Sequence, residues 1–466
     1  MGSLSQSSPH VVVFPFMSKG HTIPLLHLAR LLLHRDISVT VISTPLNSPS
    51  IRQYLKDTSA SIIDLPFPQN VPQLPNGIEN TDKLPSMSLF LPFANSTKLM
   101  QPDFDRTLEN LPRVSLIISD GFLGWTYYSG SRLGIPRIVF YGMNNYAMTI
   151  FMLVTRDRPY TSVSSDDELF AIPSFPSIKL TKNDFEEPFV NPHAKGLHQD
   201  FITEQVAANM QSKGLVVNSF YELEAKFVEF WNTQVPSCKA WCVGPLCLAE
   251  PPKEQPMKKP KYIQWLDEML RSGRSVLYVA FGTQADVSKE QLQEIATGLE
   301  RSKVSFLWLV RSKEVEVEEV LAEFEEKVKD RGLVVRDWVD QVEILSHKSV
   351  NGFMSHCGWN SVIESICESV PLIAWPMMAE QHLNARMVVE ELGVGIRVLA
   401  RNGSVRGYVG SECIESMVIE LMEGEKGKEV RKKVQEMGEF AKKAMDEGGS
   451  SWCTLDNLIQ EMCYSN

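Results

Sequence analysis

Short apolar runs, each followed by a polar loop and then an amphipathic segment, recur along the sequence and constrain its fold more than any other feature. The first run, HVVVFPF at His10–Phe16, precedes the loop MSKGHT and a leucine-rich segment that ends at Leu33. The next run is ISVTVI at Ile37–Ile42. A strand, a helix and a second strand in this order open a parallel sheet with helices on both faces. We expect Thr22 to cap the intervening helix, with Pro24 in its first turn.

The same pattern continues and then restarts after a proline-rich stretch. Leu248–Tyr262 holds four prolines in fifteen residues, a composition typical of an extended linker. At 466 residues the chain also exceeds what one ordinary core accommodates. Further strands are predicted before the linker at Ser115–Ile118, Pro136–Tyr141 and Gly214–Val217, and after it at Ser275–Phe281, Ser305–Val310, Leu333–Arg336, Val350–Met354 and Pro371–Ala374. We therefore expect an α/β protein of two doubly wound domains with a cleft between them.

The composition excludes several kinds of partner. Lys and Arg number 46 against 57 Asp and Glu, a net charge of −11, which disfavours nucleic acid and anionic membranes. No stretch of about 18 apolar residues is present, so no membrane span is expected. The sequence MGSLSQSSPH lacks the features of a secretory signal, and the 8 cysteines are scattered without zinc-binding spacing. We expect a cytoplasmic protein with reduced thiols and no metal site.

Polar side chains follow most of the predicted strands, at the edge where ligands of such sheets bind. His21 follows the first strand, and Asp120 follows the apolar run SLII. A carboxylate beside an imidazole fixes its tautomer and raises its basicity, so the two would form a general-base pair if both strand ends face the cleft. No GxSxG motif accompanies them. The base should therefore act on a bound hydroxyl rather than on a serine nucleophile.

The stretch HCGWNSVIES, which starts at His356, is typical of a turn that leads into a helix. Gly358 would let the backbone approach a ligand, and His356 and Asn360 would add hydrogen-bond donors to the positive helix end, an arrangement suited to a phosphate or pyrophosphate. The competing interpretation is a capping box, in which Ser361 and Glu364 only satisfy N–H groups of their own helix. The absence of GxGxxG and P-loop motifs disfavours a dinucleotide oxidoreductase and a P-loop NTPase.

Trp338–Gln381 gives the chain a family resemblance. These 44 positions, WVDQVEILSHKSVNGFMSHCGWNSVIESICESVPLIAWPMMAEQ, resemble the plant secondary-product signature box of the UDP-sugar-dependent family 1 glycosyltransferases. SDGF around Asp120, VNSFYELE, VGPL and AFGT extend the similarity over essentially the whole chain. The resemblance implies the GT-B fold. Its parts would be an acceptor-binding domain at 1–247, a linker at 248–262, a UDP-sugar-binding domain at 263–440 and a helical segment at 441–466 that packs back on the first domain.

The resemblance also implies roles for individual residues. His21 would be the general base and Asp120 its partner, with no metal ion required. Trp338 would stack on uracil, and Val339 would offer its backbone to the base edge. The remaining donor contacts are implied at Gln341 and Glu364 for the ribose, at Thr283, His356, Gly358, Asn360 and Ser361 around the diphosphate, and at Trp359, Glu380 and Gln381 for the sugar.

Three positions depart from the family pattern. Val339-Asp340 stands where Ala-Pro is usual, which is tolerable if the contact is made by the main chain. Glu380 replaces the commoner Asp and lengthens the arm to the sugar. Ser369 stands where a glycine commonly precedes Val-Pro, an unfavourable choice if the backbone there has a positive φ.

The implied reaction is inverting transfer of a sugar from a UDP-sugar co-substrate, UDP-glucose by preference, to a hydroxyl of a small apolar plant metabolite. No permanently bound cofactor is expected, and neither is a partner chain, so the protein should be a monomer. A flavonoid or other phenol is the first choice of acceptor, because several apolar and adaptable side chains suit a flat molecule. They are Phe16, Leu89, Phe93, Phe122, Met143 and Met378.

Several alternatives stay open at this point. The same acceptors could receive the sugar on carbon, giving a C-glycoside, or the acceptor could be a terpenoid or steroid. A protein that binds a UDP-sugar without catalysis is a rival from another class, disfavoured by the presence of both His21 and Asp120. A sugar-nucleotide epimerase of the same fold is a further one.

Overall fold

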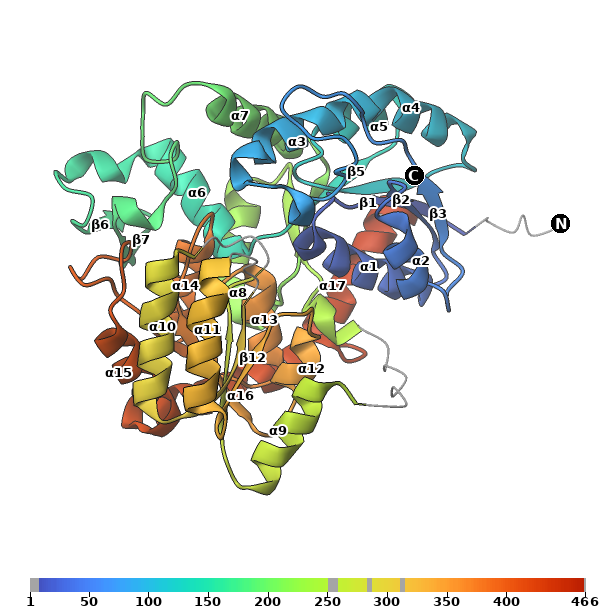
Figure 1. Cartoon of the computed structure of the whole chain (residues 1–466). Helices are drawn as coiled ribbons and strands as arrows, with labels where there is room; N and C mark the ends of the chain where they lie inside the picture. The colour runs from blue at the N-terminus through green and yellow to red at the C-terminus, as the bar shows by residue number, and fades with distance from the viewer. Residues whose placement is uncertain (1–7, 250–258, 283–286, 311–314, 465–466) are drawn as a thin grey trace. The chain divides into compact units, whose positions relative to one another are not determined.

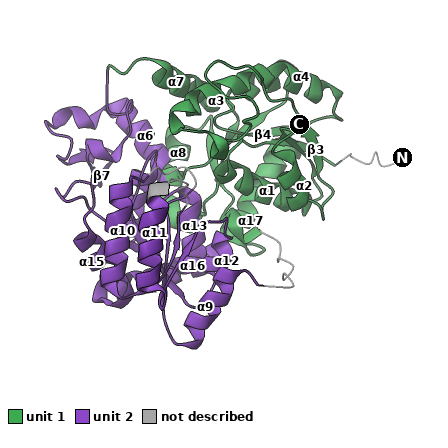
Figure 2. Cartoon of the chain, viewed as in Figure 1, with its two compact units in different colours: residues 1–145, 193–251, 443–466 green, residues 146–192, 252–442 purple. Residues whose placement is uncertain are grey.

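Two compact units make up the chain in its computed structural model, which describes residues 8–249, 259–282, 287–310 and 315–464. Unit 1 comprises residues 1–145, 193–251 and 443–466, and unit 2 comprises residues 146–192 and 252–442 (Figure 2). This division differs from the predicted domains at residues 146–192, which belong to unit 2. The predicted linker lies mostly outside the described residues, and the predicted domain boundaries stay a prediction.

The sheet of unit 1 has seven parallel strands in the order β3-β2-β1-β4-β5-β8-β9. Strands β1, β2, β3 and β5 of this sheet are labelled in Figure 1. They are β1 (His10–Phe14), β2 (Ser38–Ser43), β3 (Ser61–Asp64), β4 (Leu116–Asp120), β5 (Arg137–Tyr141), β8 (Gly214–Val217) and β9 (Lys239–Cys242). The predicted strands of this unit are confirmed to within two residues at each end, whereas β3 and β9 are not among them. The strand order reverses between β1 and β4.

Alternate residues of β1 pack into two different clusters of buried side chains. The helices of this unit are α1 (Lys19–Leu33), α2 (Ser48–Tyr54), α3 (Phe90–Ser96), α4 (Gln101–Asn110), α5 (Trp125–Leu133), α7 (Leu197–Met210), α8 (Tyr221–Gln234) and α17 (Ser450–Ile459). Val11 and Val13 pack in a cluster with side chains of α1, α2 and α17. Val12 and Phe14 pack in another, with side chains of α3, α4, α5 and α7. A strand buried on both faces is apolar along its whole length, which explains the uninterrupted first run.

Helix α1 begins earlier than the sequence pattern predicts. Ser18, in an extended conformation, is its N-cap, and the Ser18 carbonyl accepts the N–H groups of His21 and Thr22. The prediction of Thr22 as the cap is therefore wrong, because a backbone turn has already started the helix, and Pro24 lies in its second turn. The Thr22 hydroxyl instead donates to the Phe16 carbonyl at 3.1 Å. As a result, His21 lies in the first turn of a helix and not in a loop.

Unit 2 contains a six-stranded parallel sheet in the order β12-β11-β10-β13-β14-β15 and a two-stranded antiparallel hairpin, β6-β7. The strands are β6 (Phe170–Ile172), β7 (Phe175–Leu180), β10 (Val276–Ala280), β11 (Ser305–Leu309), β12 (Gly332–Val335), β13 (Val350–Ser355), β14 (Leu372–Ala374) and β15 (Gly395–Arg397). The five strands predicted after the linker are confirmed. The strand order reverses between β10 and β13.

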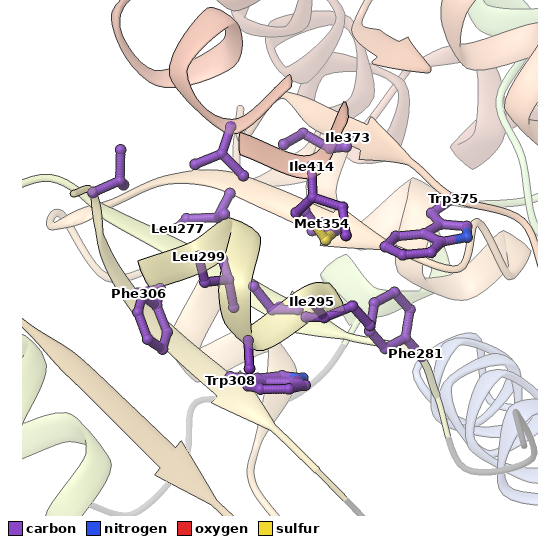
Figure 3. Close-up of a cluster of buried hydrophobic side chains, with 14 of the residues drawn as sticks. Leu277, Phe281, Ile295, Leu299, Phe306, Trp308, Met354, Ile373, Trp375 and Ile414 are labelled. Atoms are coloured by element: carbon purple, nitrogen blue, oxygen red, sulfur yellow. The ribbon is translucent and has the colours of Figure 1, made fainter. Parts of the chain in front are cut away.

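Helices pack against one face of this second sheet. The helices of unit 2 are α6 (Asn145–Asp157), α9 (Lys261–Arg271), α10 (Lys289–Ser302), α11 (Val315–Val328), α12 (Gln341–Leu345), α13 (Trp359–Cys367), α14 (Gln381–Arg386), α15 (Ser411–Glu423) and α16 (Glu425–Met445). Leu277 of β10 and Phe281 pack with Ile295 and Leu299 of α10 and with Ile414 of α15 (Figure 3). Side chains of α11 and Val430 of α16 also belong to this cluster. None of the helices in the described ranges combines the length and the hydropathy that a bilayer span needs.

The two sheets share a topology that directs attention to four strand ends. Each sheet reverses its strand order at one place, between β1 and β4 in unit 1 and between β10 and β13 in unit 2. Ligands of parallel α/β sheets bind beyond the carboxyl ends of the strands at such points. The residues that follow these four strands are therefore the first place to look for a functional site in each unit.

Candidate functional site

In unit 1, a histidine and an aspartate meet at the point where the strand order reverses. His21 Nδ1 lies 2.7 Å from Asp120 Oδ2, although the two residues are 99 positions apart in the chain. The Asp120 side chain is 2% exposed, and that of His21 is 23% exposed. An ionised carboxylate only accepts hydrogen bonds, so Nδ1 carries the hydrogen, which makes Nε2 the nitrogen that can take up a proton. The pairing expected from the two strand ends is present.

The orientation of the Asp120 carboxylate is fixed from a second side. Its Oδ1 atom accepts the backbone N–H of Phe122 at 2.9 Å, which closes a short turn after β4. One carboxylate oxygen is thus held by the turn while the other meets His21. Such a pair can hold the imidazole in one tautomer and stabilise the imidazolium that forms when a proton is taken up.

The imidazole of His21 is enclosed by two phenylalanines and one glycine. Its ring centroid lies 5.7 Å from that of Phe16 in an edge-on arrangement and 5.3 Å from that of Phe122 in a tilted one. A Cβ atom at Gly142 would come within 3.1 Å of His21 Cε1 and 3.5 Å of Nε2. The sequence analysis did not identify Gly142, and the available signal was its position directly after β5.

The apolar residues expected to bind an acceptor fall into three groups. Phe16 and Phe93 are completely buried and contact each other edge-on at 5.8 Å within the core cluster of unit 1. Leu89, Phe122 and Met143 are half-buried. Met378, also half-buried, belongs to unit 2. The acceptor-binding role of these six residues stays a prediction.

In unit 2, the segment after β12 presents an exposed indole and a capped helix. Trp338 is 62% exposed, whereas the neighbouring Val339 side chain is buried. Asp340 is the N-cap of α12, and its carboxylate accepts the N–H of Glu343 at 3.1 Å. The departure at Val339-Asp340 therefore provides a helix cap in place of a proline. Gln341 is the first residue of that helix.

Gln341 connects α12 to α13. Its Nε2 atom donates to Glu364 Oε2 at 2.7 Å and to Ser361 Oγ at 2.9 Å. The competing prediction of a capping box at Ser361 and Glu364 is wrong. Helix α13 starts at Trp359 with Gly358 as its N-cap, so Ser361 already lies inside the helix and cannot cap it. The Glu364 carboxylate is accordingly directed toward a polar side chain of the neighbouring helix.

The N-terminus of α13 is built around a buried imidazole. Gly358 is the N-cap, so no N-cap side chain accepts a hydrogen bond from the first N–H groups of α13. Cys357 before it has a φ of 62°. A Cβ atom at Gly282 would lie 2.8 Å from His356 Nε2, and one at Gly358 would lie 2.5 Å from it, so the imidazole fits against two glycines. Burial lowers the pKa of His356 to about 4. His356 is therefore neutral at pH 7 and can donate one hydrogen bond beside the helix end, but it adds no positive charge there.

The remaining predicted donor residues follow β14 or belong to α13. Gln381 Oε1 accepts the backbone N–H groups of Met377 and Met378, each at 3.0 Å, and so orders the turn that leads into α14. Glu380 is the N-cap of that helix and is half-buried, as is Asn360 in α13, whereas Trp359 is buried. Thr283 lies outside the described residues.

Two further expectations concern a turn and a metal. Ser369 has a φ of 59°, so the family's glycine position does require a left-handed backbone, which costs a serine more than a glycine. In the ranges that the structure describes, no three His, Cys, Asp or Glu side chains come close enough together to hold a metal ion. None of the eight cysteines, all of which lie among the described residues, forms a disulfide.

Two family models match the chain and together cover most of it. The model described as "UDP-glucoronosyl and UDP-glucosyl transferase" matches residues 243–428, and the one described as "Glycosyltransferase, N-terminal domain" matches residues 7–248. The chain is 52% identical to UDP-glycosyltransferase 90A1 of Arabidopsis thaliana over 473 residues, 99% of this chain and 98% of the relative.

Solved structures agree with this result. The crystal structure of Glycyrrhiza uralensis UGT73P12, complexed with glycyrrhetinic acid 3-O-monoglucuronide, matches with a TM-score of 0.88 at 30% identity, over 98% of this chain and 96% of that one. The structure of Phytolacca americana UGT2, complexed with UDP-2fluoro-glucose and pterostilbene, matches with a TM-score of 0.78 at 30% identity, over 98% and 100% of the two chains.

Proposed function

The chain belongs to the family of UDP-dependent glycosyltransferases, with the GT-B fold, and we propose that it transfers glucose with inversion from UDP-glucose to a hydroxyl of a small phenolic acceptor. The family, the enzyme class and the use of a UDP-sugar as co-substrate follow from the relatives. The sugar, the acceptor and the residue roles are the proposal. The observation that carries it is the 2.7 Å contact between His21 and Asp120 where the strand order of unit 1 reverses.

His21 acts as the general base in this proposal. Its Nε2 atom takes the proton of the acceptor hydroxyl while the acceptor oxygen attacks the anomeric carbon of the sugar. The bond between that carbon and the diphosphate oxygen breaks at the same time, and UDP leaves. Asp120 stabilises the imidazolium, because its second oxygen is held by the N–H of Phe122 and cannot turn away.

Unit 2 holds the UDP-sugar in this proposal. The exposed Trp338 indole stacks on uracil with Val339 at the base edge, and Gln341 and Glu364 contact the ribose as one hydrogen-bonded pair. The diphosphate lies at the N-terminus of α13, whose partial positive charge stabilises an anion. Neutral His356, Gly358, Asn360 and Ser361 surround it, and Thr283 assists. Trp359, Glu380 and Gln381 contact the sugar.

Aromatic rings around His21 favour a flat acceptor. Phe16, Phe90 and Phe122 contact one another edge-on within 6.0 Å, and two of them contact the imidazole. Phenolic rings pack well against such edges. The complex of the Phytolacca relative with pterostilbene supports a phenol, and that of the Glycyrrhiza relative keeps a terpenoid acceptor as the second choice. The UDP-2fluoro-glucose in the former complex supports glucose as the sugar.

Two properties complete the proposal. The enzyme is a monomer in the cytoplasm, a compartment consistent with its eight cysteines, none of which forms a disulfide in the described residues. A C-glycosyltransferase would use the same base to activate a phenol whose ring carbon attacks instead of its oxygen, so the linkage of the product has to be determined.

An acceptor screen with UDP-glucose tests the proposed function. Flavonoids, simple phenols, triterpenoids and steroids are incubated with the enzyme, products are detected by mass spectrometry, and their linkage is determined by NMR. UDP-galactose and UDP-glucuronic acid serve as competing donors. We expect an O-β-glucoside of a phenol, made fastest from UDP-glucose.

Other outcomes of the screen select a rival. Saturable UDP binding without product from any acceptor would identify a non-catalytic binding protein. Conversion of the UDP-sugar in the absence of acceptor would identify an epimerase. A carbon-linked glucose would replace the O-transferase with a C-glycosyltransferase.

A further inference from the structure

Arg137 is a buried cation next to the proposed catalytic pair of unit 1. The residue lies at the start of β5 and is 2% exposed. Burial lowers the pKa of its guanidinium to about 10, so the group still carries its charge at neutral pH. Among the described residues, its hydrogen bonds go only to hydroxyls, an amide and backbone carbonyls, and none goes to a carboxylate. A buried charge without a direct counter-ion is unfavourable unless something else offsets it.

Asp120 is the carboxylate among the titratable groups whose electrostatic interaction favours the charged form of Arg137. Asp120, Tyr141 and Cys238 stabilise the charged form of Arg137 electrostatically. Burial raises the pKa of Tyr141 to about 12 and that of Cys238 to about 11, so both are neutral at pH 7. The guanidinium therefore interacts electrostatically with the residue that pairs with His21.

The guanidinium also holds the backbone on which Asp120 lies. Its Nη2 atom donates to the Asp120 carbonyl at 3.1 Å, and its Nε atom donates to Ser119 Oγ at 2.7 Å. Its Nη1 atom donates to Asn209 Oδ1 at 2.9 Å. Asn209 in turn donates from Nδ2 to the Gly121 carbonyl at 3.0 Å. Two successive carbonyls of the turn after β4 are thus bound by two side chains that also bind each other.

Helix α7 packs directly against the same turn. A Cβ atom at Gly121 would lie 3.3 Å from Asn209 Nδ2, and one at Gly124 would lie 2.6 Å from Gln205 Oε1. The Gly124 N–H donates to that Gln205 oxygen at 2.8 Å. The two glycines of SDGFLG therefore let the backbone of the turn come within hydrogen-bonding distance of α7.

We propose that Arg137 and Asn209 are positioning residues for sugar transfer, which fix the turn at 120–124 so that Asp120 meets His21. The inference rests on the proposed role of His21 as general base. Asp120 then offers His21 a partner in a fixed position at the moment of proton uptake. A purely structural role would instead keep the core of unit 1 folded without any specific effect on proton transfer.

The ionisation of the acceptor separates these two roles. A phenol that is neutral at the assay pH needs the base, whereas an electron-poor phenol of similar size that is already ionised does not. The variants Arg137→Met and Asn209→Ala are assayed with both phenols, together with UDP affinity by calorimetry and thermal stability. Ser212→Ala is the matched control, because Ser212 Oγ accepts from the same Nη1 atom at 2.9 Å but donates to the Ala208 carbonyl of α7 rather than to the turn.

We expect Arg137→Met and Asn209→Ala to lower kcat/KM for the neutral phenol at least about tenfold and that for the ionised phenol less than about threefold. UDP affinity should be unchanged, and Ser212→Ala should affect the two phenols equally. Equal losses with both phenols, or rates like those of the parent enzyme, would overturn the proposal. If Arg137→Met does not fold, the comparison of Asn209→Ala with Ser212→Ala decides.

His21→Ala in the same assay separates a failure of this inference from a failure of the proposed function. If His21→Ala lowers kcat/KM equally for both phenols, His21 is not the base and the proposed function fails. If His21→Ala lowers kcat/KM only for the neutral phenol, while Arg137→Met and Asn209→Ala affect both phenols equally, the positioning role alone is wrong.

Discussion

The two units place a histidine at the same topological position and give it opposite properties. His21 follows β1 in unit 1, and His356 follows β13 in unit 2, each at the reversal of strand order in its sheet. His21 Nδ1 is bound to the Asp120 carboxylate at 2.7 Å. The Nδ1 atom of His356 is buried and has no hydrogen-bond partner among the described residues.

The difference shows that the groups next to an imidazole decide whether it can take up a proton. A paired imidazole can take up a proton because its carboxylate stabilises the resulting charge. An imidazole buried without an anion has a lowered pKa, about 4 for His356, and stays neutral. This difference agrees with the proposed function, in which unit 1 takes up the proton and unit 2 binds an anion through neutral donors and a helix end.

The largest effect on turnover is expected when the charge of Asp120 is removed. Asp120→Asn leaves His21 with a neutral partner that can hold the wrong tautomer, and we expect kcat to fall roughly 10²–10⁴-fold. Steady-state kinetics with the acceptor from the screen measure this. Asp64→Asn is the control, since Asp64 also ends a strand of this sheet but pairs with Arg52 at 3.2 Å. A variant Asp120→Asn with parental kcat would show that His21 does not depend on its carboxylate.

Unit 2 should respond in binding rather than in turnover. Glu364→Gln weakens the bond from Gln341 Nε2 at 2.7 Å and removes a charged acceptor, so we expect UDP affinity to fall about 10- to 100-fold. Calorimetric titration with UDP measures the effect, and kcat at saturating UDP-glucose should change little. Glu368→Gln, at the other end of α13, is the matched control. Equal affinity in Glu364→Gln and the parent would remove Glu364 from the nucleotide site.

Much of the fold follows from local patterns, whereas helix starts do not. Apolar runs with both faces buried predict the central strands, and Gly214–Val217 matches β8 at both ends. The short β15 and the half-exposed β3 lack this signal. Thr22 and Ser361 both have the sequence of a cap, but backbone turns at Ser18 and Gly358 start their helices earlier.

The candidate site divides in the same way. His21 and Asp120 could be paired from sequence because both follow strands that are expected to be parallel. The bonds from Gln341 to Glu364 and from Arg137 to Asn209 could not, since each joins residues whose approach depends on side-chain packing. The neutrality of His356 depends on its burial, which no motif encodes.

Two buried histidines, His356 and His382, should lower the stability of the folded chain in acid. The folded-state pKa of His356, about 4, and of His382, about 3, lie below the unfolded value of about 6.5, so between these values only the unfolded chain takes up the protons. Stability should therefore be fully present above about pH 6.5 and fall as the pH drops, by about 1.4 kcal/mol per pH unit for each histidine. Denaturant unfolding between pH 7.5 and pH 5, with His382→Gln halving the slope, measures this. A slope equal in both proteins would contradict it.

The smallest effect is expected on stability, at the turn that contains Ser369. Ser369 has a φ of 59°, so Ser369→Gly should stabilise the chain by up to about 1 kcal/mol. Thermal unfolding measures the gain, and kcat should stay at the parental value. Loss of stability would show that the serine side chain contributes more than the backbone strain costs.

The central claim is that unit 1 supplies the base while unit 2 binds the donor, and His21→Ala tests it most directly when binding and turnover are measured on the same preparation. Calorimetry gives the affinity for UDP, and a product assay at saturating UDP-glucose gives kcat. We predict parental UDP affinity with kcat lowered roughly 10²–10⁴-fold. Parental turnover in His21→Ala would contradict the account.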